Sequence, residues 1–436
     1  MRHLFFGGVH PAGRKELSAG GAPIPAPIPA QVVIPMSQHI GALCVPLVKP
    51  GDQVKMGQKI GDGEGLCAPV HASVSGTVLA VEPRRHPNGS RVLSVVIEND
   101  FQDTPDRTLT PHLDGKGLTS DEIVAIIREA GIVGMGGATF PTDVKAKSGI
   151  GKVDTLIANA CECEPYITAD DTLLCSYPEQ VLEGMELLCR VLEPKRAILA
   201  VEDNKKEAIS ILRAQMEKRP NLELKVLPTR YPQGAEKQLI QALTGRQVPP
   251  GGLPSAVGCA VFNAATFAAV YRAVFLGEPV TRRIVTVTGE AVKQPKNMIA
   301  RMGTSFAELV EAAGGLTDDV WKVLSGGPMM GVAQADLEAP VLKGTNAILC
   351  LSNAQNGESA RSVPCIRCGK CVGVCPMRLQ PLNLYRYEKA GDLEALDRLH
   401  LTDCIECGCC AYTCPSKLPL VEHFRLGKRA LKEGKK

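Results

Sequence analysis

The sequence contains no long uninterrupted apolar run. Its longest weakly polar stretch, Ala256 to Phe275, is interrupted by Asn263, Thr266 and Arg272, which is typical of a buried loop and helix rather than of a membrane span. The N-terminal residues form too short an apolar stretch for a secretory signal and carry no small-residue cleavage pattern. We therefore expect a chain that is not exported and that is soluble or peripheral to a membrane.

Patterns of charge and of catalytic residues are also sparse. The net charge is only +3, so we expect no nucleic-acid partner. The one locally basic segment, residues 421–436, is predicted to be a solvated tail, with attraction to an anionic membrane surface as the alternative. The histidines are dispersed, and His39 and His71 are more typical of structural residues than of ligands. No Ser/His/Asp or metal-hydrolase arrangement is present in the sequence.

Cysteine is abundant, but its distribution argues against a disulfide framework. The chain has 17 cysteines, an odd total. Those that follow no pattern are Cys44, Cys67, Cys161, Cys163, Cys175, Cys189, Cys259, Cys350 and Cys409. The remaining cysteines are spaced as metal ligands, and a reducing compartment suits thiolates that hold clusters.

These remaining cysteines form two runs of identical spacing. Each run reads C-x-x-C-x-x-C-x-x-x-C-P, from Cys365 to Pro376 and from Cys404 to Pro415. This is the spacing of a bacterial-type ferredoxin with two [4Fe–4S] clusters, in which the cysteine before proline ligates the other cluster. The predicted ligand sets are Cys365, Cys368, Cys371 and Cys414 for one cluster, and Cys404, Cys407, Cys410 and Cys375 for the other. Zinc is the alternative. A zinc site needs four ligands, however, and it requires neither the third cysteine in register nor the Cys-Pro that ends each run.

Residues 31–100 show short β runs separated by turn signals. The phrases V-K-P-G-D (48–52) and V-S-G-T-V (74–78) resemble the biotinyl/lipoyl carrier fold, a barrel-sandwich hybrid. That fold modifies a lysine at a hairpin tip, and the segment from Asp62 to Gly76 contains no lysine. We therefore expect a docking or structural role rather than a carrier function.

Between residues 101 and 280, apolar runs alternate with helical patterns, which implies an α/β layer. Thr119 and Glu122 predict a capping box at the start of one of these helices. In residues 281–353, strand patterns surround one helical phrase, Ser305 to Ala313, and this suggests a β-grasp-like module.

A glycine-rich loop, Gly134-Met-Gly-Gly-Ala-Thr-Phe-Pro-Thr-Asp-Val-Lys145, precedes a predicted helix in the α/β layer. Gly134, Gly136 and Gly137 leave backbone N–H groups exposed and allow a phosphate to approach, and Lys145 supplies a positive charge. A plain tight turn is the alternative, because such loops are common. The loop is neither a G-x-G-x-x-G fingerprint nor a Walker A loop.

Several phrases resemble the NADH-oxidising flavoprotein family, which includes the complex I flavin subunit. They occur in the same order: Gly134 to Lys145, N-A-C-E-C-E-P (Asn159 to Pro165), Y-P-Q-G-A-E (Tyr231 to Glu236) and V-F-N (Val261 to Asn263). The departures from that family are Met135, Thr139, Cys161, Ala235 and Ala264. The chain instead resembles the RnfC family of the Rnf complex. The resemblance rests on these departures together with S-Q-H-I-G-A (37–42) and A-P-V-H-A-S-V-S-G (68–76), and it covers essentially the whole chain.

The resemblance implies a cofactor set. FMN would lie on the Gly134–Lys145 loop, with Asn159 and Asn263 near its ribityl chain or ring. NAD(H) would stack over the flavin against Phe140, for which a core aromatic is the alternative. Residues predicted to contact ribose or water, or to line the same site, are Glu164, Glu236, Glu162 and Gly234. A solvated acidic loop is the alternative for Glu162, Glu164, Asp170 and Asp171.

The resemblance further implies an NADH-dependent oxidoreductase subunit of an ion-translocating ferredoxin:NAD complex. Its expected partners are the membrane and redox subunits of that complex, with ferredoxin reached through a partner subunit, at the cytoplasmic face of the bacterial membrane. A flavin-dependent cobalamin reductase of a bacterial microcompartment and a flavin-less electron relay are the alternatives. No basic cluster for a 2′-phosphate is evident, which favours NADH over NADPH.

Length and pattern together predict an α/β multidomain protein. In chain order we predict an extended segment (1–30), the barrel-sandwich hybrid (31–100), the α/β domain for FMN and NADH (101–280), the β-grasp-like, SLBB-like domain (281–353), an α-helical two-cluster ferredoxin-like domain (354–420) and the basic tail (421–436).

Overall fold

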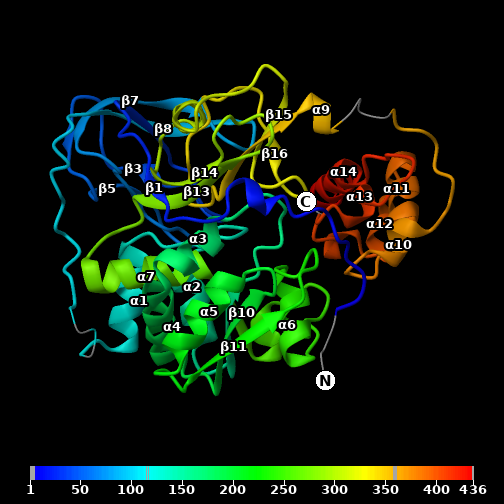
Figure 1. Ribbon diagram of the computed structural model, residues 1–436, viewed down its shortest axis with the longest axis horizontal. Coiled ribbons are helices and arrows are strands. Elements are labelled where there is room, and N and C mark those ends of the chain that lie inside the picture. Colours follow the sequence, from blue (N-terminus) through cyan, green and yellow to red (C-terminus); the bar gives the residue numbers. More distant parts are fainter. Residues whose placement is uncertain (1–4, 114, 116, 357–360, 435–436) are drawn as a thin grey trace.

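The N-terminal segment links units that lie far apart in the sequence. The computed structural model describes residues 5–113, 115, 117–356 and 361–434. The amide of Gly8 donates to the carbonyl of Val374 in the cysteine-rich region (2.8 Å). Further along, strand β1 (Ile24–Pro25) pairs in parallel with β14 (Lys296–Arg301). In Figure 1 this segment, in dark blue, runs from the red cluster helices toward the sheets on the other side.

Two small sheets form the next unit, and valine and isoleucine side chains fill the space between them. One sheet has the order β2-β8-β7-β4 and the other β3-β5-β6. Val32, Ile60 and Val95 are fully buried in the shared core. The strands are β2 (Gln31–Pro35), β3 (Val45–Pro46), β4 (Gln53–Val54), β5 (Lys59–Asp62), β6 (Val70–His71), β7 (Gly76–Arg85) and β8 (Arg91–Asn99). The predicted barrel-sandwich fold class is confirmed.

The central unit is a parallel four-stranded sheet of order β11-β10-β9-β12, and helices pack against it (Figure 1). Strands β9, β10 and β12 are mostly buried, as expected for strands covered on both faces, whereas the edge strand β11 is only partly buried. The four strands are β9 (Thr155–Ala160), β10 (Arg196–Glu202), β11 (Leu222–Leu227) and β12 (Cys259–Asn263). Its helices are α1 (Ser120–Glu129), α2 (Thr142–Gly149), α3 (Ala169–Ser176), α4 (Pro178–Leu192), α5 (Lys206–Met216), α6 (Glu236–Thr244) and α7 (Ala264–Leu276).

Two predictions for this unit have clear outcomes. The capping box is confirmed, because Thr119 accepts from the amide of Glu122 and the Glu122 carboxylate accepts from the amide of Thr119. The expectation of a loop and helix over residues 256–275 was wrong in part. Buried strand β12 occupies residues 259–263, because a short apolar run cannot be assigned to loop or strand by periodicity alone.

The third unit has β-grasp topology. In its sheet, β14-β13-β17-β15 lie in that order, with β13 (Arg282–Thr288) parallel to β17 (Ala347–Ser352) and antiparallel to β14. Helix α8 (Phe306–Ala312) packs against the sheet and begins with a capping box formed by Ser305 and Glu308. The remaining elements are β15 (Val320–Ser325), β16 (Val332–Ala333) and α9 (Asn353–Asn356).

The C-terminal unit is helical and packs around the two cysteine runs. Its helices are α10 (Lys370–Gly373), α11 (Pro381–Ala390), α12 (Leu393–Arg398), α13 (Cys409–Tyr412) and α14 (Leu420–Glu433). The prediction of a basic tail was wrong up to Gly434, because α14 buries Leu420, Phe424 and Leu431 in the core of this unit. Lys435 and Lys436 lie outside the described residues. Within those residues, no helix is both long and apolar enough to cross a membrane.

A buried lysine joins the first three units. Lys343 has no exposed surface, and its ammonium donates to the carbonyls of Pro69 (2.5 Å) and Gly131 (2.7 Å). An ion pair between Arg128 and Asp62 (2.6 Å) supports the same junction. Because a buried ammonium is costly unless its protons are hydrogen-bonded, these carbonyls fix how the barrel-sandwich unit sits on the central unit.

Helices α4 and α7 meet at Gly184, and this contact yields a prediction. A Cβ at Gly184 would lie 2.0 Å from the carbonyl oxygen of Phe267. We expect Gly184→Ala to destabilise the protein by about 1–3 kcal/mol through overpacking, measured as a lower thermal unfolding temperature by circular dichroism. Gly13→Ala is the control, since a Cβ there meets no atom within 4 Å. Equal unfolding temperatures for both variants would contradict the close helix contact.

Candidate functional site

The two cysteine loops have the same backbone conformation. Arg367 and Glu406 occupy matching positions in the two runs and both have positive φ (54° and 55°). Gly369 and Gly408, two residues further on, also have positive φ (74° and 79°). This conformation turns backbone N–H groups toward the sulfurs, since the amide of Glu406 donates to Cys404 Sγ (3.4 Å) and that of Arg367 to Cys365 Sγ (3.4 Å).

One predicted ligand set lines a single buried cavity. The cysteines around this cavity are Cys375, Cys404, Cys407 and Cys410, together with Cys409. The amide of Leu379 donates to Cys375 Sγ (3.3 Å). Burial raises the pKa of the Cys404 thiol to about 11, so an electropositive group in the cavity is needed to stabilise its thiolate. Four thiols from two separate loops around one space, with amides aimed at the sulfurs, fit a [4Fe–4S] cube.

The second ligand set lies nearer the surface. Cys365 and Cys368 are exposed, Cys371 is half-buried and Cys414 is buried. Cys371 is close enough to Cys414 and Cys365 to interact with both electrostatically. The two sets therefore differ in solvent exposure, although their sequence spacing is identical.

The glycine-rich loop is a narrow hairpin whose tip stays open. Its ends are joined by a hydrogen bond from the amide of Gly134 to the carbonyl of Phe140 (2.9 Å). A Cβ at Gly136 would lie 2.5 Å from Asn263 Nδ2, so only glycine allows this approach. Gly136 and Gly137 are exposed, and within the described part of the chain their amides donate to no protein acceptor. Free amides on a glycine loop fit a phosphate group.

Residues below the loop hold it in place. The amide of Met135 donates to the hydroxyl of Thr266 (3.1 Å), and the buried guanidinium of Arg283 donates to the carbonyl of Met135 (3.2 Å). The Met135 side chain is buried, so an apolar residue suits this position, where the complex I flavoproteins have arginine. Phe140 is half-buried at the end of the hairpin.

Both predicted asparagines lie at the carboxyl edge of the parallel sheet. Asn159 is the last but one residue of β9 and Asn263 is the last residue of β12, and the two are register partners on neighbouring strands. Asn159 donates to the carbonyl of Gly234 (2.8 Å), and Asn263 donates to Asp170 (2.6 Å). Ligands of open α/β sheets bind at this edge, so the structure brings the glycine loop and both asparagines to one place.

A lysine and a glutamate from the predicted set pair beside this edge. Lys145 of α2 lies 2.6 Å from the carboxylate of Glu236, the first residue of α6. The Lys145 ammonium also lies over the Phe262 ring, 5.3 Å from its centroid. Both side chains of the ion pair remain partly exposed, so an anionic ligand can reach the lysine at this position.

The acidic residues do not form a solvated loop. Glu162 is only 8% exposed, and its carboxylate pairs with the buried Lys205 (3.0 Å) and accepts from the amide of Asp170 (2.8 Å). Lys15, from the N-terminal segment, donates to the carbonyls of Glu162 (2.8 Å) and Ile167 (2.5 Å). Cationic side chains from distant segments therefore neutralise this loop.

Glu164 and Tyr231 connect the central unit to the buried thiol cavity. The Glu164 carboxylate accepts from the amide of Met329 (3.2 Å), and it lies 3.4 Å from the hydroxyl of Tyr231. The same hydroxyl donates to the carbonyl of Cys407 (2.8 Å). Burial raises the pKa of Glu164 to about 7. Glu164 thus lies at the junction with the cysteine loops.

The sequence did not identify the residues that support the site. Lys15, Lys205, Arg283 and Tyr231 make their contacts across long sequence separations, and no local pattern marks them. Tyr231 was the exception in part, since it stands in the Y-P-Q-G-A-E phrase. Its contact with Cys407 could not be read from that phrase.

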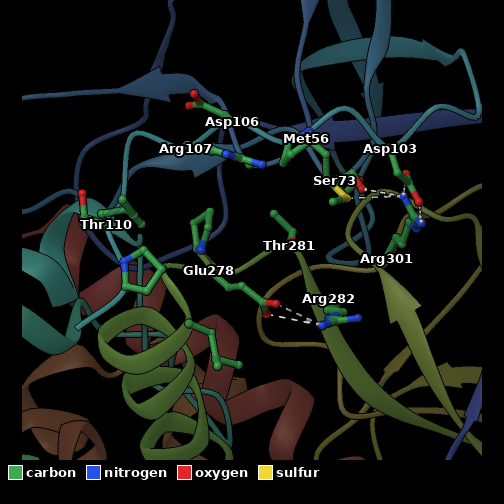
Figure 2. A pocket seen from close by; sticks show the side chains of 17 residues that line it. Met56, Ser73, Asp103, Asp106, Arg107, Thr110, Glu278, Thr281, Arg282 and Arg301 are labelled. Atoms are coloured by element: carbon green, nitrogen blue, oxygen red, sulfur yellow. Dashed lines mark hydrogen bonds and ion pairs between the residues drawn. The ribbon is translucent and has the colours of Figure 1, made fainter. Parts of the chain in front are cut away.

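A cavity of about 630 Å³ lies elsewhere. Figure 2 shows it between the barrel-sandwich unit and residues 276–282, lined by Met56, Asp103, Glu278 and Arg301 among others. None of the predicted cofactor residues lines this cavity. It is therefore separate from the site at the sheet edge.

Four domain families match parts of the chain. Residues 3–102 match the RnfC barrel sandwich hybrid domain, residues 127–272 the Nuo51 FMN-binding domain, residues 284–333 the SLBB domain and residues 364–418 the 4Fe-4S dicluster domain. These matches confirm the predicted fold class, and they support FMN and [4Fe–4S] clusters as the cofactors of this architecture.

Curated relatives resemble the chain over its whole length. It is 46% identical over 429 residues to the C subunit of the Na⁺-translocating ferredoxin:NAD⁺ oxidoreductase complex of Acetobacterium woodii, covering 98% of this chain and 97% of that protein. It is 44% identical to the C subunit of the ion-translocating oxidoreductase complex of Salmonella arizonae, covering 97% of this chain and 63% of that protein. The chain therefore spans less than two thirds of the Salmonella relative.

Solved structures share the fold at lower identity. An NAD⁺-reducing [NiFe]-hydrogenase in the H₂-reduced state superposes with a TM-score of 0.52 at 23% identity, covering 75% of this chain and 65% of the hydrogenase chain. The same enzyme in the air-oxidised state gives a TM-score of 0.53.

Fold and site define an electron-transfer flavoprotein with a dicluster iron–sulfur domain, that is, one component of an oxidoreductase. Its relatives match it along the whole chain. The chain belongs to the RnfC family of ion-translocating oxidoreductase complexes.

Asp170 provides a test of the electrostatics at the sheet edge. Burial, and then repulsion from Glu162, raise its pKa to about 7, whereas an unfolded aspartate has a pKa of about 3.9. Between these values the folded state holds a proton that the unfolded state has lost, so stability falls as the pH rises. In the unmodified chain, the free energy of unfolding should therefore fall between about pH 5 and about pH 8. We expect this fall to be smaller by about 1–3 kcal/mol in Asp170→Asn, measured by denaturant titrations at each pH.

Asp318→Asn is the control for this experiment, because Asp318 is not one of the buried carboxylates of the sheet edge. Its pH dependence should equal that of the unmodified chain. An unchanged pH dependence in Asp170→Asn would show that the carboxylate at the sheet edge ionises freely in the folded protein.

Proposed function

We propose that the chain transfers electrons between NAD(H) and the other subunits of a membrane-bound, ion-translocating ferredoxin:NAD oxidoreductase. The observation that carries this proposal is a short series of contacts that runs from the sheet edge to the buried thiol cavity. Gly234 accepts from Asn159 at the edge, and its amide donates to Cys163 Sγ (3.3 Å). Cys163, Tyr231 and Cys407 pack in one apolar cluster, so a continuous path of packed atoms joins the two sites.

The residues at the sheet edge suit FMN. The free amides of Gly136 and Gly137 and the charge of Lys145 would hold its phosphate, and Asn159 and Asn263 would face its ribityl chain or ring. When bound, FMN supplies the conversion between a two-electron hydride donor and one-electron acceptors. Glu236 keeps Lys145 in position through their ion pair.

NAD(H) would bind over the open side of the hairpin. Phe140 is half-buried at the hairpin's end and can offer a ring face, while Glu236 is exposed enough to meet a ribose hydroxyl. Glu162 and Glu164 would act at a distance, because their carboxylates already have protein partners. We propose NADH rather than NADPH as the substrate, since no basic cluster for a 2′-phosphate is present in the sequence.

The two cysteine sets would act in a fixed order. The set of Cys375, Cys404, Cys407 and Cys410 is buried against Tyr231, so its cluster would exchange electrons with the central unit. The set that contains Cys365 and Cys368 is exposed, so its cluster would face a partner subunit. The name of the Acetobacterium relative supports ferredoxin as the distant partner, reached through another subunit.

We further propose attachment to the cytoplasmic face of the bacterial membrane through partner subunits. Two observations support this location. The relatives are named as parts of ion-translocating complexes, and ion translocation requires a membrane. The exposed cluster thiolates need a reducing compartment, which favours the cytoplasmic side.

An anaerobic reconstitution experiment tests the function and the order of the clusters. The unmodified protein, loaded with FMN and about eight irons, should lose flavin and cluster absorbance when NADH is added. Cys414→Ser should keep about four irons and still reduce its buried cluster, whereas Cys375→Ser should leave the exposed cluster oxidised on the same timescale. Electron paramagnetic resonance distinguishes the cluster that is reduced.

These two cysteines are a matched pair, since both precede proline and are 8–9% exposed. Full iron content with no flavin binding and no response to NADH would contradict the oxidoreductase function and leave an electron relay. Rapid reduction of the exposed cluster in Cys375→Ser would contradict the proposed order.

Lys145 and Lys147 allow a separate test of the phosphate site. Both lie on α2, but Lys145 faces the sheet edge and Lys147 is exposed. We expect Lys145→Gln to weaken FMN binding by about 5- to 50-fold, as for the loss of a charge-assisted hydrogen bond, measured by flavin fluorescence titration. Lys147→Gln should bind FMN as the unmodified protein does. Equal affinities for both variants would place the phosphate elsewhere.

A further inference from the structure

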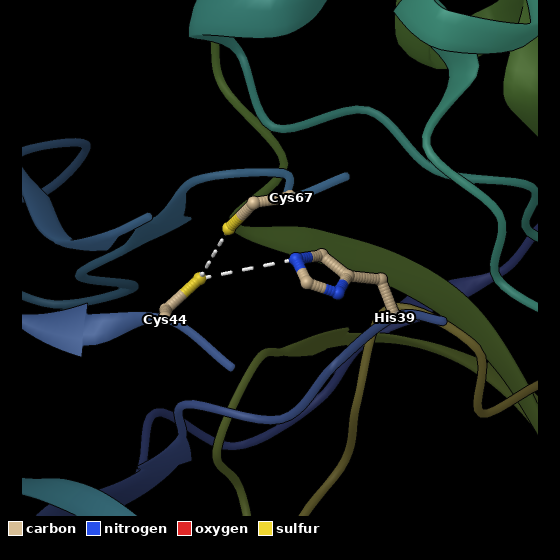
Figure 3. A group of neighbouring side chains, drawn as sticks. All are labelled: His39, Cys44 and Cys67. Carbon is tan, nitrogen blue, oxygen red and sulfur yellow. Dashed lines mark hydrogen bonds between the residues drawn. The ribbon is translucent and has the colours of Figure 1, made fainter. Parts of the chain in front are cut away.

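A second group of potential metal ligands lies in the barrel-sandwich unit, away from the cysteine runs. Figure 3 shows His39, Cys44 and Cys67 with their ligand atoms turned toward one another. His39 and Cys44 lie between strands β2 and β3, and Cys67 lies between β5 and β6. Cys44 is 3% exposed and Cys67 is fully buried, while His39 is half-buried.

The separations from Cys44 Sγ to the other two ligand atoms are close to those around a tetrahedral zinc ion. With Zn–S bonds of about 2.3 Å and a Zn–N bond of about 2.0–2.1 Å, tetrahedral angles place two sulfurs about 3.8 Å apart and a sulfur and nitrogen about 3.6 Å apart. In the structure, Cys44 Sγ lies 3.4 Å from Cys67 Sγ and 3.9 Å from His39 Nε2. All three ligand atoms lie within 4.8 Å of one another, so one ion can reach them with small adjustments.

A disulfide explains the arrangement less well. The observed sulfur separation of 3.4 Å far exceeds a disulfide bond of about 2.05 Å. A disulfide would also leave the approach of His39 Nε2 to Cys44 unexplained. The chain's other thiols are suited to clusters that require a reducing compartment, where disulfides are rare.

We propose that His39 Nε2 and the thiolates of Cys44 and Cys67 bind one Zn²⁺ ion, with water in the fourth position. Two thiolates balance the charge of Zn²⁺, and soft sulfur with imidazole nitrogen is a donor set that zinc prefers. Because His39 is half-buried, its side chain borders solvent, which would supply the water. The sequence predicted a structural role for His39, and zinc would give that role a definite form.

The ion would fix the segment that contacts the glycine-rich loop. On either side of His39, the Gln38 side chain accepts from the amide of Lys343 (3.1 Å) and the amide of Ile40 donates to the carbonyl of Thr139 (3.4 Å). Holding His39 to two cysteines of the barrel-sandwich core therefore anchors both contacts. This inference does not depend on the proposed function, because it concerns metal content alone.

Metal analysis of the cluster-loaded, full-length protein tests the proposal. We expect about one zinc per chain in the unmodified protein, and loss of that zinc in Cys67→Ala and His39→Ala with iron content unchanged. Cys189→Ala, which removes a half-buried thiol on α4, is the control and should keep its zinc. X-ray absorption at the zinc edge of the unmodified protein should show two sulfurs at about 2.3 Å and a nitrogen at about 2.0–2.1 Å.

Three outcomes would overturn the proposal. The first is unmodified protein without zinc in which both thiols react as free cysteines. The second is a Cys44–Cys67 disulfide, seen by mass spectrometry of non-reduced peptides. The third is zinc with only sulfur neighbours, or zinc retained in both Cys67→Ala and His39→Ala, which would place the ion on the cluster cysteines. The absorption measurement needs no variant, so it decides the question even if Cys67→Ala fails to fold.

Discussion

The contact between Tyr231 and the loop of Cys407 sets the arrangement of the functional parts. One hydroxyl donates to the carbonyl of Cys407 and reaches the carboxylate of Glu164, so it ties a cysteine loop to two segments of the central unit. Together with Gln238, whose side chain donates to the carbonyl of Pro376 (3.3 Å), this contact fixes the buried thiol cavity relative to the sheet edge. Electron transfer between two sites needs such a fixed relation, because the path between them must be short and packed.

The same region concentrates charge that has to be balanced. Glu162, Asp170 and Glu202 gather behind the sheet edge, and burial raises the pKa of Asp170 and Glu202 to about 7. Lys205 and Lys15 supply the opposing charge. Lys15 comes from the N-terminal segment, which therefore belongs to the electrostatics of the site as much as to the fold. The ion pairs and hydrogen bonds of these groups keep the polar side of the site fixed.

Local chemistry explains which features were predictable. The cluster spacing, the glycine loop and the capping boxes each occupy a short stretch in which residue type and position specify one geometry. Lys343 and Tyr231 act across more than 170 residues, and no short pattern encodes such contacts. Helix α14 was within reach, because Leu420, Phe424 and Leu431 follow a helical repeat among the basic residues. The charge pattern masked that repeat.

The two cysteine runs show what spacing leaves undetermined. Their spacings are equivalent, so spacing alone gives the two clusters the same environment. In the folded chain, one set is enclosed beside Tyr231 and the other presents Cys365 and Cys368 to solvent. Solvent exposure and hydrogen bonds to sulfur set the potential of a cluster, so equal spacing does not imply equal potential. The difference in exposure between the two sets is therefore a property of the packing around the runs, to which Tyr231 contributes beside the loop of Cys407.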